Sequence, residues 1–195
     1  MRDSSTADAA EFYTLASTAI GTCGLAWNDI GLTRLQLPEA SAADTEARLR
    51  RRGGTPSTAA PRDDIAACLK RLIAYFDGER VDFVDVPIDA SALGTFDADI
   101  YRALRGIGWG RTTSYGALAA SVGAPGAARA VGVAMARNAW PIIVPCHRVL
   151  AAHGAMGGFS AYGGTMTKQM LLTLEGNGLD MLPLFAPSES STLTP

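Results

Sequence analysis

The chain places a cysteine, a histidine and an arginine in direct succession. Cys146, His147 and Arg148 follow the largely β-branched run 142–145 and include one of only two histidines in the protein. A thiolate, rather than a thiol, is the nucleophile, and a neighbouring base or positive charge makes it available near neutral pH. We therefore predict that Cys146 is a nucleophile activated by His147. An isolated Cys-His pair is otherwise more often a buried core cysteine beside a surface turn.

A histidine that acts as a base needs a partner that orients it. No carboxylate lies between Asp99 and Glu175, and Glu175 ends a predicted helix just before Gly176. A negative charge near a helix C-terminus is unfavourable by roughly 0.3–1 kcal/mol, which favours a specific partner for Glu175. The sequence thus predicts a triad of Cys146, His147 and Glu175. The alternative is a solvent-facing residue at a helix end.

A glycine-rich segment, residues 154–164, separates His147 from Glu175 and carries Phe159 and Tyr162. Glycine lets backbone amides approach a flat ligand closely, and aromatic rings offer stacking faces. The segment could line a ligand pocket or form a flexible surface loop.

Two short helices are expected before the cysteine. Ser114 can cap the first, which Gly123 stops, and the alanine-rich stretch 127–136 forms the second. Such a pair is typical of a helix-turn-helix, although an ordinary helical hairpin packed through alanines has the same pattern. Residues 140–145 are expected to be extended and buried, because their prolines argue against a central strand. This segment would hold Cys146 in a pocket rather than on a mobile tip.

The first half of the chain has α+β character. Strands are predicted at 12–17, 32–37 and 81–88, and a helix at 41–52. A second helix begins at Asp63, with its apolar stripe formed by Ile65, Cys68, Leu69, Leu72, Ile73 and Phe76. The predicted fold class is α+β: a small N-terminal α/β domain with an antiparallel sheet, then a mostly helical domain containing the helix-turn-helix. The expected bounds are 1–92, with 1–10 disordered, then 93–182, and a flexible tail at 183–195.

Cysteine usage and charge restrict the setting and the partners. The three cysteines are widely spaced, which indicates neither a disulfide framework nor a close zinc pair. We expect a cytoplasmic protein with no signal peptide and no membrane span. Residues 1–95 carry 10 basic and 14 acidic side chains, whereas residues 96–175 carry 7 and 3. This segregation favours a face for an anionic partner, or merely a basic domain balanced by an acidic one.

Residues 96–176 resemble the O6-alkylguanine-DNA alkyltransferase family. The matching strings are Phe96…Ile100-Tyr101, Thr113-Ser114-Tyr115-Gly116, Ala128-Arg129-Ala130-Val131-Gly132, Asn138, Pro145-Cys146-His147-Arg148-Val149 and Leu171-Leu172…Leu174-Glu175-Gly176. A Pro-Cys-His-Arg motif after a helix-turn-helix is highly specific. The N-terminal part, at 21–27 and 31–37, is compatible with the family's N-terminal α/β domain.

The resemblance implies a suicide DNA repair protein that flips O6-alkylguanine, and O4-alkylthymine, out of double-stranded DNA. Cys146 would accept the alkyl group, His147 would draw off the thiol proton through a water, and Glu175 would orient His147. Tyr115 would donate a hydrogen bond to the leaving guanine, and Asn138 would brace the cysteine segment. Arg129 would fill the vacated place in the base stack. The implied DNA or base contacts are Ser114, Tyr115, Ala128, Arg129, Met135, Arg148, Val149, Phe159 and Ser160.

No cofactor and no metal site is implied, and the protein is expected to act as a monomer. The human relative's zinc site has no matching Cys/His group here. Phe159 stands where many relatives have tyrosine, and Ala161-Tyr162 resembles a two-residue insertion, so the pocket wall differs. Two rival functions are a binding-only helix-turn-helix protein and a cysteine hydrolase, which needs an oxyanion hole. A zinc deaminase is excluded because no Pro-Cys-x-x-Cys pair exists.

Overall fold

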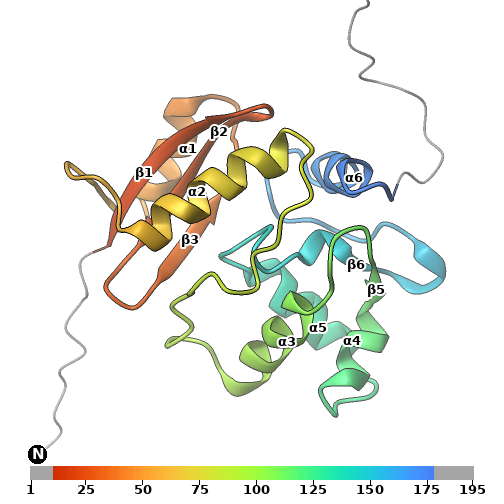
Figure 1. Cartoon of the computed structure of the whole chain (residues 1–195). Helices are drawn as coiled ribbons and strands as arrows, with labels where there is room; N and C mark the ends of the chain where they lie inside the picture. Colours follow the sequence, from red (N-terminus) through yellow and green to blue (C-terminus); the bar gives the residue numbers. More distant parts are fainter. Residues whose placement is uncertain (1–10, 178–195) are drawn as a thin grey trace, which may run out of the picture.

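The computed structural model describes residues 11–177. A small sheet with a helix on each face forms the N-terminal part, and a mostly helical part follows it (Figure 1). This is the predicted α+β class. The expectations for residues 1–10 and for the tail 183–195 lie outside the described residues.

The sheet has four strands in the order β3-β2-β1-β4. β1 (Phe12–Thr18), β2 (Gly21–Trp27) and β3 (Leu32–Gln36) are antiparallel neighbours, and the short β4 (Thr55–Pro56) runs parallel to β1. Because β3 is an edge strand, its outer backbone groups are available to the other half of the molecule.

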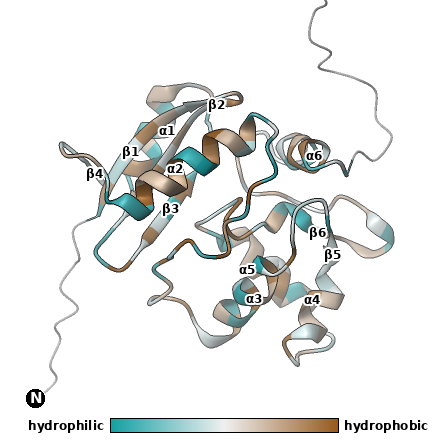
Figure 2. Cartoon of the chain, viewed as in Figure 1, coloured by the Kyte–Doolittle hydropathy of each residue, from teal (hydrophilic) through white to brown (hydrophobic). Residues whose placement is uncertain are grey.

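The two faces of the sheet are covered differently. α1 (Ala42–Arg50), capped by Ser41, lies so close to β2 that a Cβ on Gly24 would meet Leu49 Cδ1 at 2.4 Å. α2 (Asp63–Phe76) covers the other face, and its bands of apolar and polar residues are visible in Figure 2. Its buried stripe differs slightly from the predicted one, since Tyr75 is buried while Leu69 and Ile73 are only half-buried.

The C-terminal part contains the predicted helix-turn-helix. α3 (Thr95–Arg105) precedes α4 (Tyr115–Ser121) and α5 (Ala128–Arg137), and α6 (Thr165–Leu174) follows the cysteine segment. Ser114 caps α4 as expected, its hydroxyl accepting a hydrogen bond from the Ala117 amide at 3.0 Å. Two short strands, β5 (Thr113–Ser114) and β6 (Val149–Leu150), pair in parallel and tie the start of α4 to the chain just after the cysteine.

The predicted strand at 81–88 is wrong. Only Ile88 makes a bridge, to Leu32, and the rest of the segment turns between the two halves. The Asp82 carboxylate accepts a hydrogen bond from the Val84 amide, and Arg105 donates to the carbonyls of residues 83, 84 and 86. These side chains satisfy the backbone groups that a neighbouring strand would otherwise bind.

The predicted extended conformation of residues 140–145 is also wrong, although their burial is confirmed. The segment is a series of turns in which Ile142 has a φ of 74°. Trp140 and residues 142–145 are buried. Their carbonyl and amide groups close local bonds, such as Val144 N to Trp140 O at 2.8 Å, instead of a sheet ladder. Within residues 11–177, no helix has the length and apolar character needed to cross a bilayer.

Candidate active site

Cys146 begins a single 3-10 turn, Cys146–Arg148, at the end of this buried segment. Only 5% of the residue is exposed. Asn138, the residue that ends α5, braces the segment on both sides: its Nδ2 donates to the Val144 carbonyl at 2.8 Å, and its Oδ1 accepts from the Trp140 amide at 2.9 Å. The thiol is therefore held at a fixed place between α5 and the 3-10 turn.

The structure brings His147 and Glu175 together. His147 is fully buried, and its Nε2 lies 2.9 Å from Glu175 Oε1. Because the Glu175 carboxylate can only accept in this hydrogen bond, Nε2 carries the hydrogen of the neutral ring and Nδ1 keeps a lone pair. Nδ1 is buried and has no hydrogen-bond partner among the described residues. His147, the general base of the predicted triad, therefore has an unprotonated Nδ1, and it directly follows Cys146 in the sequence.

Glu175 accepts more hydrogen bonds than a simple triad requires. Arg148 binds both of its oxygens, Nη2 to Oε1 at 2.7 Å and Nε to Oε2 at 2.8 Å, and also donates to the Ile107 carbonyl. The Tyr75 hydroxyl donates to Oε1 at 2.8 Å, and the Gly110 amide lies 3.4 Å from Oε2. A bidentate arginine fixes the plane of a carboxylate. Glu175 consequently holds His147 in one orientation.

This arrangement sets the charge states of the triad. Burial alone would raise the pKa of Glu175, but hydrogen bonds and charge from His147 and Arg148 outweigh it and lower that pKa to about 2. Burial lowers the pKa of His147, and Glu175 opposes that shift only in part. At neutral pH the site therefore contains a charged Glu175 and a neutral His147, which is the form able to take a proton.

Burial raises the pKa of the Cys146 thiol. A hydrogen bond from Asn138 and the positive charge of Lys168 act in the opposite direction. Lys168 is itself buried, its Nζ donating to the Val149 carbonyl at 2.6 Å and lying 6.0 Å from the centre of the Tyr115 ring. The resting thiol therefore keeps its proton, and the surrounding groups favour the thiolate once a base removes it.

A cavity of about 360 Å³ opens beside the thiol, large enough to receive a flat ring. Its lining, which defines the base cavity, consists of Tyr115, Gly132, Met135, Ala136, Cys146, Gly158, Phe159 and Ser160. Gly157, which has a φ of 64°, lets the glycine-rich segment pass close to Tyr115, since a Cβ there would lie 3.3 Å from the Tyr115 hydroxyl. The cavity thus joins the start of α4, the middle of α5 and the 154–164 segment.

The residues expected to contact DNA or the base separate into three groups. Ser114, Ala128 and Arg129 lie at the starts of α4 and α5, and Arg129 is exposed. Tyr115, Met135, Phe159 and Ser160 line the base cavity instead.

Two further residues expected to contact DNA or the base lie in the interior. Arg148 is 6% exposed, and its guanidinium is bound to Glu175 and Ile107 as described above. Val149 is fully buried, with its carbonyl accepting from Lys168. The Arg148 guanidinium is thus engaged with the Glu175 carboxylate, and contact of Arg148 and Val149 with DNA or the base stays a prediction.

Sequence reasoning missed Tyr75 and Lys168. Lys168 occupies a position on α6 that shares a face with Leu171, Leu172 and Glu175, so a charged residue in an otherwise buried stripe was the available signal. Tyr75 lies far away in sequence, and nothing in its neighbourhood pointed to Glu175.

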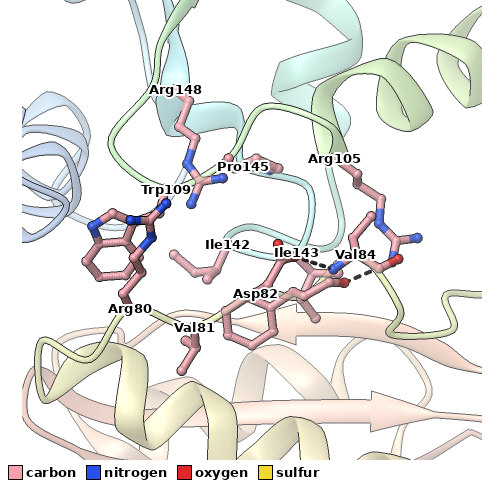
Figure 3. A pocket seen from close by; sticks show the side chains of 12 residues that line it. Arg80, Val81, Asp82, Val84, Arg105, Trp109, Ile142, Ile143, Pro145 and Arg148 are labelled. Atoms are coloured by element: carbon pink, nitrogen blue, oxygen red, sulfur yellow. Dashed lines mark hydrogen bonds between the residues drawn. The ribbon is translucent and has the colours of Figure 1, made fainter.

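A second cavity, of about 220 Å³, lies between the connecting segment 80–84 and residues 142–145, and Arg148 and Trp109 also line it (Figure 3). In Figure 3 Arg148 descends towards it beside Trp109, while Arg105 is tied to the connecting segment by the dashed hydrogen bonds. Within residues 11–177, no group of three or more His, Cys, Asp or Glu side chains is placed to hold a metal ion.

Two family models match nearly the whole described chain. The 6-O-methylguanine DNA methyltransferase ribonuclease-like domain matches residues 12–90, and the DNA binding domain of the same protein matches residues 95–177. The methylated-DNA–protein-cysteine methyltransferase of Mycolicibacterium paratuberculosis is 40% identical over 163 residues, covering 84% of this chain and 91% of the relative. The constitutive enzyme of Bacillus subtilis is 36% identical over 165 residues, covering 84% and 94%.

A solved structure has the same arrangement. The crystal structure of Mycobacterium tuberculosis OGT in complex with DNA is similar with a TM-score of 0.68 and 39% identity, covering 84% of this chain and 92% of that one. The O6-methylguanine-DNA methyltransferase from Pyrococcus kodakaraensis has a TM-score of 0.62 at 24% identity, which is a likeness of fold.

Proposed function

The chain belongs to the 6-O-methylguanine DNA methyltransferase family, and we propose that it repairs DNA by moving the alkyl group of O6-alkylguanine, or O4-alkylthymine, irreversibly onto its own Cys146. One observation carries the assignment of the acceptor. Cys146 is the only cysteine that combines an adjacent His147–Glu175 pair with a place in the wall of a cavity sized for a base. None of the three cysteines forms a disulfide, which fits a cytoplasmic setting.

The transfer is an in-line displacement. His147 takes the thiol proton on Nδ1, through a water, and Glu175 stabilises the imidazolium that forms. The sulfur then forms a bond to the alkyl carbon while the carbon–O6 bond breaks, and that bond's electron pair stays on the guanine. The guanine takes a proton from the Tyr115 hydroxyl, and the thiol proton held on His147 finally replaces it, so the base leaves neutral and the thiol proton is the one that it has gained.

Tyr115 and Lys168 support the departure of the base. Burial raises the pKa of Tyr115, so its hydroxyl keeps its proton until the reaction and can donate a hydrogen bond to the guanine as negative charge develops there. Lys168, which lies over the face of the Tyr115 ring, contributes positive charge on the same side. The segment 154–164 covers the base with Phe159 and with backbone amides.

The helix-turn-helix delivers the base. α5 lies along the DNA groove with its small residues, and exposed Arg129 fills the space that the extruded nucleotide leaves. A thioether is chemically stable, so the protein acts once. A cysteine hydrolase using the same residues would turn over repeatedly and would leave no adduct on the sulfur.

Mass spectrometry of the protein mixed with duplex containing O6-methylguanine tests the proposal. We expect one added methyl group per protein, on the peptide that contains Cys146. Burial raises the pKa of both Cys23 and Cys68 to about 12, so neither should be modified. Repeated turnover without an adduct, or a methyl group on another cysteine, would refute the assignment.

A further inference from the structure

A third cavity, of about 420 Å³, also reaches Cys146, and it opens towards the sheet rather than along α5. It shares Ala136, Cys146, Phe159 and Ser160 with the base cavity. Its remaining lining comes from β3 and α1 on one side and from the end of α5 on the other. We call it the alkyl cavity, lined by Arg34, Leu35, Gln36, Leu37, Glu39, Arg48, Arg52, Ala136, Arg137, Asn138, Pro141, Cys146, Phe159, Ser160 and Ala161.

The walls of the alkyl cavity are held together by backbone contacts. The edge strand β3 donates from the Leu35 amide to the Ala139 carbonyl at 2.9 Å, and the Trp140 indole donates to the Leu32 carbonyl at 2.7 Å. The strand is thereby fixed against the segment that leads to Cys146. Arg34 and Gln36, two residues apart, share one face of the strand at this junction.

The charge in the alkyl cavity is unbalanced. Four arginines and a single carboxylate line it. Arg48 pairs with Glu39 at 3.2 Å and Arg137 with Asp97 at 2.9 Å, but Arg34 and Arg52 form no ion pair within the described part of the chain. The Nε of Arg34 is buried without a hydrogen-bond partner there. Burial, and then the charge of Arg52, lowers the pKa of Arg34. A bound anion would relieve both effects.

The reaction geometry indicates what enters this space. In an in-line displacement the reacting carbon lies between O6 and Sγ, so any further substituent on it must project sideways from that line. The guanine fills the base cavity. The alkyl cavity also contacts Cys146, and its lining includes the unpaired Arg34 and Arg52.

We propose that the alkyl cavity receives the substituent of bulky O6 adducts, and that Arg34 and Arg52 give preference to substituents that end in a carboxylate. This inference rests on the proposed alkyl transfer and concerns its substrate class. The base is recognised as before, while the N-terminal domain selects among the groups that the base carries.

Two free bases of equal shape test the preference: O6-(4-carboxybenzyl)guanine and O6-(4-carbamoylbenzyl)guanine. We would measure the rate constant of Cys146 alkylation for each and take the ratio, carboxylate over amide. Arg34→Gln and Arg52→Gln should each lower the ratio roughly two- to fivefold, as expected for one partly exposed ion pair. Added salt should lower it in the wild type. Arg51→Gln is the matched control, because Arg51 is exposed at the same helix end and does not line the cavity.

Comparison of each variant with the wild type removes the intrinsic difference in reactivity between the two bases. Equal ratios in the wild type, Arg34→Gln and Arg52→Gln would overturn the proposal. So would an unchanged ratio with weaker binding to undamaged duplex, which would assign the arginines to a DNA phosphate. Reaction of the wild type with O6-methylguanine duplex separates the two hypotheses, since its failure would refute alkyl transfer itself. Arg52 is exposed, so Arg52→Gln keeps the test valid if Arg34→Gln does not fold.

Discussion

Tyr75 and Glu175, 100 residues apart, meet through a buried hydrogen bond of 2.8 Å. Tyr75 belongs to α2 on the sheet, and Glu175 ends α6 in the helical part. Burial raises the pKa of Tyr75, so the hydroxyl remains a donor. The carboxylate that orients His147 is consequently held by both halves of the molecule.

Tyr75→Phe keeps the ring, including its edge-to-face contact with Trp109 at 5.2 Å, and removes only the donor. A hydrogen bond to a charged group contributes about 1.5–3 kcal/mol, so we expect a loss of that order in the free energy of unfolding measured with urea. We also expect slower reaction with free O6-benzylguanine. The control is Tyr13→Phe. The Tyr13 hydroxyl donates to Glu46 Oε1 at 2.6 Å, and neither residue belongs to the active site, so this change should affect stability alone. An unchanged rate in Tyr75→Phe would mean that the bond is only structural.

His147→Gln and Glu175→Gln should each slow alkyl transfer, by about the 10²–10⁴-fold that general-base assistance contributes or by less. The double variant should lose far less than the sum of the two free-energy changes, because the residues act as one unit. Single-turnover rates with O6-methylguanine duplex measure this. Additive losses would remove Glu175 from the proton relay.

Arg148→Gln should destabilise the fold by about 3–5 kcal/mol, since it leaves the buried Glu175 charge without its bidentate partner. The salt dependence of duplex binding should stay the same, because the guanidinium is bound to Glu175 and to the Ile107 carbonyl in the interior. Thermal unfolding and binding titrations check the two parts. Arg111→Gln, at an exposed position, is the control for a lost positive charge. A stable Arg148→Gln variant with weaker DNA binding would support the predicted DNA contact of this residue instead.

Arg129→Ala should impair repair of duplex more than reaction with free O6-benzylguanine, because only the duplex needs its base stack held open after extrusion. Binding of duplex should weaken as salt rises, since cations replace counterions on the phosphates. Parallel rate measurements on the two substrates decide the matter. Equal losses would indicate a structural arginine that supports the helical hairpin.

Stability should fall in two stages as the pH is lowered. Burial holds the pKa of His147 below its usual 6.5, so the unfolded chain binds this proton first and stability declines from about pH 6.5 downwards. The pKa of Glu175 is lowered from 4.5 to about 2, so its contribution is complete above about pH 4.5 and is lost as the pH falls towards 2.

Urea unfolding across this pH range measures both stages. His147→Gln should flatten the first and Glu175→Gln the second. A wild-type stability that stays constant between pH 7 and pH 5 would contradict the neutral, buried state assigned to His147.

The sequence by itself determined the chemistry and the local elements. The Cys146-His147 pair, the single carboxylate Glu175 in a long acid-free stretch, the helix capped by Ser114 and the alanine-rich helix that follows it all derive from residue type and short-range spacing. These features depend on hydrogen bonds and apolar periods within a few residues, which a sequence displays directly. The match to a known family rests on the same motifs.

Only the tertiary structure decided how the two halves cooperate. Segment 81–88 has the alternation of a strand, yet Arg105 binds its carbonyls and it turns instead. Arg148 looked available for DNA, but Glu175 lies within reach of its guanidinium in the interior. Tyr75 and Arg34 reach the site from the N-terminal domain. Such contacts depend on which surfaces pack together over long sequence separations, and the energy of a buried charge depends on every group around it, so local pattern carries no record of them.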